Sequence, residues 1–151
     1  MKQDINICYL ISSDYLQLTL TSIDYIKRFY KSNKYNLRFI IIGTDIFSVP
    51  RDILYIQSKC PELPLMHQRS HIPDMLDINR VIFLDSDTVT TTCISKLWEI
   101  ELSNNIIAGV IHYYYPTFES MYKFYDLDFT PFNNRKDSLF FNGGVMLIDC
   151  N

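Results

Sequence analysis

One short stretch carries most of the information about the fold, because residues 81–88 read VIFLDSDT. Its first half is an uninterrupted apolar run, which is typical of a strand buried on both faces of a sheet. Its second half places Asp85 and Asp87 two positions apart, directly after that strand. In open α/β sheets, ligands bind beyond the carboxyl ends of the strands. The stretch therefore predicts an α/β protein with these carboxylates at a ligand site.

The residues upstream alternate between apolar strands and an amphipathic helix. Residues 5–11 and 37–42 are short apolar runs, and apolar residues recur at helical spacing from residue 15 to about residue 31. A helix of that length is a suitable crossover between parallel strands. These segments predict a strand–helix–strand unit with parallel pairing.

Further elements are expected on both sides of residues 81–88. They are a strand at 53–56, a helix at 63–76 interrupted near Pro73, a helix at 94–102, a buried strand at 106–111, an aromatic stretch at 113–137 with Pro131 and a short helix at 119–125, and a strand at 138–149. Alternating strands and helices indicate a Rossmann-like α/β fold, with a mixed, mostly parallel sheet flanked by helices. The 151 residues contain no linker and are expected to form a single domain, residues 1–151.

Composition and charge narrow the classes of function. Hydrophobic residues make up 48% of the chain, which supports a packed core. The net charge is -3 and the basic residues are scattered, so a nucleic-acid partner is not expected. No apolar run is long enough to span a membrane, and the amino terminus has no signal-peptide core. None of the four cysteines forms a CxxC pair, so a zinc or redox motif has no support. Free thiols without a disulfide framework suggest a reducing compartment, and the chain is therefore expected to be cytoplasmic.

Asp85 and Asp87 are candidate ligands of a metal ion. If the strand continues, residues i and i+2 point to the same side, and both carboxylates converge on one cation. Hard oxygen ligands select Mg²⁺ or Mn²⁺, and such an ion can stabilise a departing diphosphate. The alternative is a pair of surface acids in a loop, which the preceding apolar strand makes less favourable.

Two other segments offer polar groups to a ligand. Asn142 carries a donor and an acceptor, and the adjacent Gly143 and Gly144 permit close approach of a ligand, although a bulge or bend explains these glycines equally well. Arg69 could pair with phosphate oxygens, or it could be an ordinary surface arginine.

A third segment, Ser12-Ser13-Asp14-Tyr15, follows the first predicted strand. Its polar groups could bind a nucleoside, and its aromatic ring could stack on the base. The alternative is that Ser13 or Asp14 caps the following helix.

The order of these blocks resembles glycosyltransferase family 8, which includes glycogenin-like and bacterial lipopolysaccharide galactosyl- and glucosyltransferases. The matching blocks are the Ser-Asp-Tyr segment at 13–15, RSHIP at 69–73, RVIFLDSD at 80–87, ISKLW at 94–98 and FNGGVMLID at 141–149. The resemblance implies a GT-A nucleotide-diphospho-sugar transferase fold. It also implies a UDP-hexose donor with Mn²⁺ (or Mg²⁺), and transfer of the hexosyl group to an unknown glycan, protein or lipid acceptor.

The family's functional positions can be carried over one at a time. Asp85 and Asp87 match the metal ligands, Tyr15 matches the ring that stacks on uracil, and Arg69 matches an arginine near the donor sugar and phosphates. The donor site implied in this way comprises Leu10, Ser12, Asp14, Tyr15, Arg69, Asp85, Ser86, Asp87, Asn142, Gly143 and Gly144.

The chain departs from the family pattern in two respects, and two alternatives remain open. Ser12 stands where the family often carries an aspartate, and the domain is expected to be C-terminally short, without the later histidine and lysine of the family's metal and diphosphate site. A nucleotide-sugar-binding module without transferase activity is therefore one alternative. The other is a haloacid-dehalogenase-type phosphatase with Asp85 as nucleophile and Asp87 as general acid, but the strands and helix before the motif argue against it.

Overall fold

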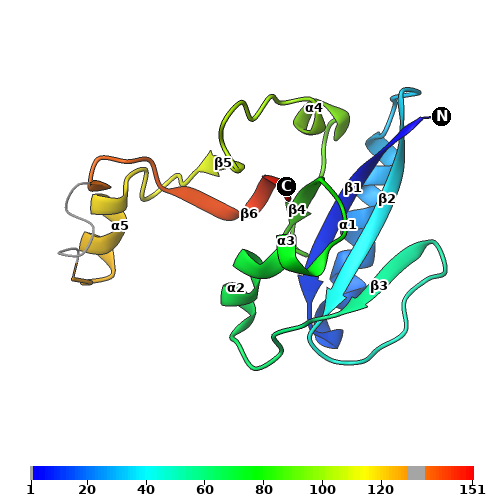
Figure 1. The fold of residues 1–151 in the computed structure, drawn as a ribbon, viewed down its shortest axis with the longest axis horizontal. Coiled ribbons are helices and arrows are strands. Elements are labelled where there is room, and N and C mark those ends of the chain that lie inside the picture. The colour runs from blue at the N-terminus through cyan, green and yellow to red at the C-terminus, as the bar shows by residue number, and fades with distance from the viewer. Residues whose placement is uncertain (1, 129–134) are drawn as a thin grey trace. The chain divides into compact units, whose positions relative to one another are not determined.

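The computed structural model, which describes residues 2–128 and 135–151, contains a mixed six-stranded sheet (Figure 1). The strand order is β3-β2-β1-β4-β6-β5. The strands are β1 (Gln3–Ile11), β2 (Tyr35–Gly43), β3 (Ile53–Gln57), β4 (Arg80–Leu84), β5 (Ile107–Ile111) and β6 (Phe141–Asp149). The helices are η1 (Ser13–Tyr15), α1 (Leu16–Phe29), α2 (Leu65–Gln68), η2 (Arg69–His71), α3 (Ile72–Met75), α4 (Ser95–Trp98) and α5 (Phe118–Phe124).

Strand β4 has a partner on each side. It pairs in parallel with β1, where Ile82 lies opposite Ile7, and antiparallel with β6, where Ile82 lies opposite Leu147. All three side chains are fully buried. Since β1, β2 and β3 also pair in parallel, the predicted mixed, mostly parallel sheet is confirmed.

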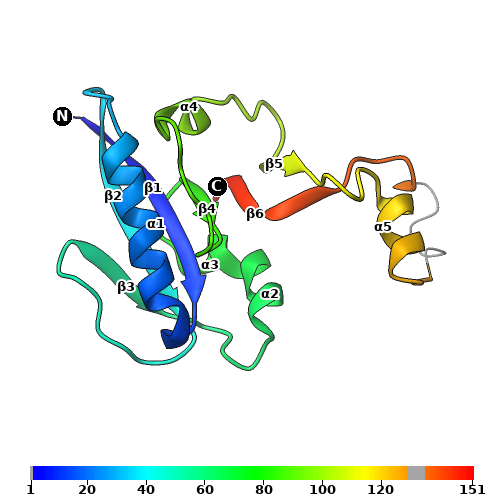
Figure 2. The ribbon, with the colours of Figure 1, turned by 180° about the vertical axis from the view of Figure 1, so that it is seen from behind.

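Both faces of the sheet are covered along β1, β2 and β4, as their near-continuous apolar runs predict. Successive residues of β1 belong to different cores, because Tyr9 packs in the cluster that contains Ile23 of α1, and Cys8 packs in the cluster that contains Ile72 of α3. Figure 2 shows α1 lying along β1 and β2. Side chains of a strand point alternately to its two faces, so each strand of this kind contributes to both cores.

Two predicted helices are shorter than expected. The segment at 63–76 divides into α2, η2 and α3, and its break falls at Arg69–His71. Pro73 instead lies in the first turn of α3, where a missing N–H leaves no hydrogen bond unmade. The helix predicted at 94–102 is reduced to α4, and the helical ladder ends after Glu99, because the N–H of Ile100 donates to Leu97, only three residues back, at 3.3 Å.

The prediction of a buried strand at 106–111 is wrong in one respect. Strand β5 is present, but Ile107, Val110 and Ile111 are 40%, 58% and 49% exposed. β5 is the last strand in the sheet order, and an apolar run alone does not distinguish an edge strand from a central one.

The described residues form two compact units, Met1–Ala108 with Gly144–Asn151, and Gly109–Gly143. The second unit contains α5, whose start is fixed by a capping box between Thr117 and Ser120, and this confirms the predicted short helix. An aromatic cluster surrounds Tyr115, with ring centroids 4.5 Å from Phe124 and 4.7 Å from His112. Pro131 of the predicted aromatic stretch lies outside the described residues.

Across the part of the chain that is described, no helix is long and apolar enough to cross a membrane.

Replacing Ile82 tests the central position of β4. Ile82→Ala is expected to lower the free energy of unfolding by about 2–5 kcal/mol, and Ile82→Val by about 0.5–1.5 kcal/mol, because a cavity forms between β1 and β6. Ile46→Ala, at a side chain that is 89% exposed, is the matched control and is expected to change the free energy of unfolding by less than about 0.5 kcal/mol. Denaturant unfolding measures all three. Equal small losses for the two alanine variants would contradict this packing.

Candidate functional site

The two aspartates lie in a turn that follows β4. The strand ends at Leu84, and the N–H of Thr88 donates to the carbonyl oxygen of Asp85 at 3.1 Å. The expectation that Asp85 and Asp87 project from a continuing strand is therefore wrong. The last ladder bond runs from the Asp85 N–H to the carbonyl of Gly144 at 2.8 Å, and the polar residues after it favour a turn.

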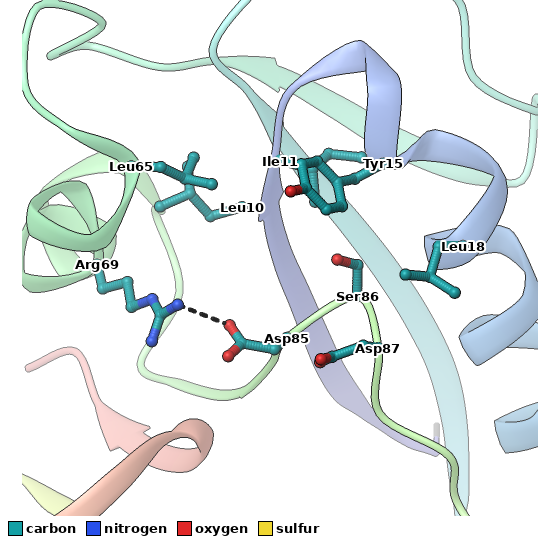
Figure 3. A pocket seen from close by; sticks show the side chains of 9 residues that line it. All are labelled: Leu10, Ile11, Tyr15, Leu18, Leu65, Arg69, Asp85, Ser86 and Asp87. Carbon is teal, nitrogen blue, oxygen red and sulfur yellow. Dashed lines mark ion pairs between the residues drawn. The ribbon is translucent and has the colours of Figure 1, made fainter.

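A pocket of about 260 Å³ opens beside this turn. Its lining residues are Leu10, Ile11, Tyr15, Leu18, Leu65, Arg69, Asp85, Ser86 and Asp87. It brings together five predicted polar or aromatic site residues from three separate segments, together with Leu10. Figure 3 shows the carboxylates of Asp85 and Asp87 extending from the turn toward the side on which Arg69 lies. The turn thus places both acids at one pocket, as a continuing strand would also have done.

Arg69 forms an ion pair with Asp85. Its Nη2 lies 3.0 Å from Asp85 Oδ1, and the two side chains are only 30% and 31% exposed. The guanidinium carbon lies 5.5 Å from the centroid of the Phe83 ring, so an aromatic face of β4 also supports the arginine. Arg69 is held in place by contacts on two sides, which is unlike an ordinary surface arginine.

The charges at the turn oppose one another. Burial raises the pKa of the Asp85 carboxyl above its ordinary value, the Arg69 guanidinium partly offsets this, and the negative charge of Asp87 raises it further. An acidic pair of this kind is stabilised by any additional cation that enters the pocket.

The donor set at the turn fits a hard divalent cation. Asp85 and Asp87 supply carboxylate oxygens, and Mg²⁺ in such sites commonly takes one or two carboxylates, with phosphates and water as its other ligands. Among residues 2–128 and 135–151, no group of three His, Cys, Asp or Glu side chains gathers in a way that could hold an ion by itself. Two carboxylates alone would leave most coordination positions of such an ion to other ligands, such as phosphate oxygens and water.

The segment after β1 agrees with the nucleoside-binding interpretation at one residue only, and it does not cap a helix as the alternative expected. Tyr15 lines the pocket and is 49% exposed, but Ser12 and Asp14 do not line it. Neither η1 nor α1 has a side-chain cap, so capping by Ser13 or Asp14 does not occur. Ser13 instead bonds to Asp45 beyond β2, through its N–H at 2.9 Å and through its hydroxyl. No local pattern indicated Asp45, because the contact joins residues 32 positions apart.

The glycine-rich block divides between the two units. The carbonyl of Gly144 receives the Asp85 N–H, so this residue lies at the base of the turn. Asn142 and Gly143 belong to the second unit and do not line the pocket. Neither Gly143 nor Gly144 has a positive φ, and both residues lie within β6. Sequence reasoning also missed the apolar pocket residues Ile11, Leu18 and Leu65, whose spacing resembles that of ordinary core residues.

Comparison with known proteins identifies the family. The model of glycosyl transferase family 8 matches residues 5–151. This chain belongs to glycosyltransferase family 8. Two relatives from Arabidopsis thaliana are the probable galacturonosyltransferase-like 6 and 9, which are 39% and 36% identical over 97 and 94 residues. Each match covers 58% of this family 8 chain but only 27% and 24% of the relative, so the chain spans about a quarter of their length.

Solved structures share the fold of this family 8 chain. The galactosyltransferase LgtC, in complex with donor and acceptor sugar analogues, has a TM-score of 0.75 at 15% identity, over 97% of this chain and 58% of that one. GlyE of Streptococcus pneumoniae gives a TM-score of 0.63 at 20% identity, over 99% and 35% of the two chains. Mouse xyloside xylosyltransferase 1 gives 0.65 at 14% identity, over 97% and 67%. The predicted GT-A fold is confirmed, and the phosphatase and the inactive binding module are not favoured.

Replacing Ser13 tests the link to Asp45. The Ser13 hydroxyl and N–H hold the pKa of the Asp45 carboxyl below its ordinary value. A depressed pKa stabilises the fold at neutral pH, and this stabilisation is lost as the pH falls through the pKa of the folded state. In Ser13→Ala the N–H remains, so the pKa of Asp45 is expected to rise part of the way toward its ordinary value. Carboxyl chemical shifts in an NMR pH titration measure it. Asp52, whose pKa is lowered by Lys27, serves as the internal control, and an unmoved Asp45 would contradict the link.

Proposed function

We propose that the protein containing this chain transfers a hexosyl group from a UDP-hexose to a glycan, protein or lipid acceptor, with Mn²⁺ or Mg²⁺ held by Asp85 and Asp87. The observation that carries the proposal is the pocket beside the turn. It combines two carboxylates, a guanidinium and an aromatic ring, on a chain of glycosyltransferase family 8. These are the groups that a metal, a diphosphate and a nucleobase require.

Asp85 and Asp87 are the proposed metal ligands. The bound ion would neutralise the diphosphate and stabilise it as a leaving group. The negative charge of Asp87 beside Asp85 favours uptake of a cation, because a cation relieves the repulsion between the two carboxylates. The protein's part is to keep two carboxylates at one side of the pocket.

Arg69 is the proposed phosphate ligand. A guanidinium presents several N–H groups in one plane and can bind two phosphate oxygens at once. In the pocket only Nη2 is committed to Asp85, at 3.0 Å, and the rest of the group lies against Phe83. Arg69 could therefore approach a diphosphate while it still borders the metal ligand.

The uridine is proposed to stack on Tyr15, which lies across the pocket from Arg69 (Figure 3). Leu10, Ile11, Leu18 and Leu65 supply the apolar wall. The remaining proposed donor contacts within the first unit are Ser12, Asp14, Ser86 and Gly144. The names of the relatives concern galacturonosyl and galactosyl transfer, and this supports a sugar of galacto configuration among the UDP-hexoses to be tested.

The four cysteines are free thiols, which supports a reducing compartment such as the cytoplasm.

Binding of UDP is expected to depend on the metal and on Asp87. Calorimetry with Mn²⁺ should give a Kd that rises at least about tenfold in Asp87→Asn, because a charged ligand of the ion is lost. Chelation of the metal should raise the Kd of the unmodified protein in the same way. Asp52→Asn is the matched control, since Asp52 is exposed and pairs only with Lys27 in a surface ion pair. If UDP did not bind at all, both the transferase and the binding-module hypotheses would fail.

Turnover separates the transferase from the binding module. With Mn²⁺, the full-length protein is expected to release UDP from at least one of UDP-glucose, UDP-galactose and UDP-galacturonate. Binding of UDP without any release would favour the binding module. Hydrolysis of a generic phosphomonoester, without UDP binding, would favour the phosphatase.

Replacing Tyr15 tests the proposed stacking. Tyr15→Ala is expected to raise the Kd for UDP about tenfold, since stacking of a base on an aromatic ring contributes about 1–3 kcal/mol. Tyr15→Phe keeps the ring and is expected to bind within about twofold of the unmodified protein. Calorimetry with UDP and with inorganic pyrophosphate separates the contributions, because pyrophosphate has no base. An equal effect on both ligands would contradict a role in base stacking.

A further inference from the structure

A chain of hydroxyl groups runs beneath the turn that carries Asp85 and Asp87. Tyr9 of β1 contacts Ser22 of α1, with 2.9 Å between Oη and Oγ. Ser22 Oγ lies 3.3 Å from Thr88 Oγ1, and Thr88 Oγ1 lies 2.7 Å from the carbonyl oxygen of Asp85. Tyr9 and Ser22 are buried, so these contacts are shielded from bulk water.

The direction of every hydrogen bond in this chain is fixed by its last member. A carbonyl oxygen only accepts, so the single proton of the Thr88 hydroxyl is directed at Asp85. The contact with Ser22 then requires Ser22 to donate to Thr88, and Tyr9 must donate to Ser22. Burial raises the pKa of Tyr9, so its phenol keeps the proton that this direction needs. Hydrogen bonds aligned head to tail strengthen one another.

The chain ends on an atom that controls the turn. The carbonyl of Asp85 also accepts the N–H of Thr88 at 3.1 Å, and this is the bond that closes the turn. On its other side, the N–H of Asp85 donates to the carbonyl of Gly144 at 2.8 Å. The peptide groups around Asp85 are thus held from β6 and from Thr88, while Ser86 and Asp87 occupy the centre of the turn. Rotation of these central peptides would redirect the Asp87 side chain relative to that of Asp85.

We propose that Thr88 is a positioning residue, which, together with Ser22, fixes the turn so that the carboxylates of Asp85 and Asp87 face one metal–diphosphate group. This inference rests on the proposed function, because the group that the carboxylates would hold is the one proposed there. Thr88 itself does not line the pocket, and it acts only through the backbone of Asp85.

The hydroxyl groups have graded roles, which makes the inference testable. Thr88→Val removes the donor to Asp85 while keeping a similar shape, whereas Thr88→Ser keeps it. Ser22→Ala removes the bond that orients Thr88 and leaves the direct bond to Asp85 in place. Tyr9→Phe leaves Ser22 able to donate to Thr88. The effects on binding should therefore decrease from Thr88→Val through Ser22→Ala to Tyr9→Phe.

The test is the Kd for UDP in the presence of Mn²⁺, with the free energy of unfolding measured on the same samples. Thr88→Val is expected to raise the Kd about tenfold, and Ser22→Ala about threefold, while Thr88→Ser and Tyr9→Phe stay within about twofold. Without metal, the Kd for UDP should change little in all four variants. Thr91→Val is the matched control, because it makes the same substitution at an exposed residue three positions further on, and should leave the Kd unchanged.

The outcomes separate positioning from general stability. A Kd for Thr88→Val equal to that of the unmodified protein, with UDP and Mn²⁺ still binding, overturns this inference alone. Equal losses in Thr88→Val and Thr88→Ser overturn it as well, since the hydroxyl would then not matter. If Thr88→Val does not fold, the comparison of Ser22→Ala with Tyr9→Phe decides, and equal Kd values for these two overturn it. If the unmodified protein binds no UDP with Mn²⁺, the proposed function fails and this inference fails with it.

Discussion

The position of the site depends on one backbone constraint, the pairing of β4 on both sides. Parallel bonds to β1 and antiparallel bonds to β6 leave this short strand no freedom of register. Its apolar residues are buried in the two cores, so the chain can become polar only beyond Leu84. The ladder ends with the bond from Asp85 to Gly144, and the turn follows at once. A carboxylate at positions 81–84 of β4 would be buried in apolar surroundings at a large cost in free energy.

The charge of Arg69 explains why the two acids are tolerated side by side. Asp85 is half-buried and close to Asp87, which raises its pKa, and Arg69 offers the compensating charge. Arg69 comes from η2, at the break in the helical segment after Pro64, and its guanidinium lies over Phe83 of β4. Helix α2 ends at Gln68, so Arg69 lies at the break in the helical segment. In one continuous helix the direction of the Arg69 side chain would be set by the helical repeat.

The sequence was sufficient for the elements that depend on local pattern. Strands β1, β2, β3 and β4 and helix α1 follow from apolar runs and helical spacing, and the family follows from the blocks around Asp85 and Asn142. The exposure of β5 did not follow, because burial of an apolar strand depends on which elements pack against it. The length of α4 did not follow either, because the apolar spacing of residues 94–102 contains no signal that ends the helix at Trp98.

The candidate site shows the same division at the level of single residues. Asp85, Asp87, Arg69 and Tyr15 are recognisable because their chemistry is uncommon beside apolar strands. Asp45 and Thr88 are ordinary polar residues, and only the folded chain brings them into contact with Ser13 and Ser22, 32 and 66 positions away in sequence. A motif records the groups that touch a ligand, whereas their orientation comes from distant groups that a motif does not contain. In this chain Asp85 and Asp87 stand on a turn and not on a strand, so the hydrogen bonds that close the turn set the course of the backbone that carries both acids.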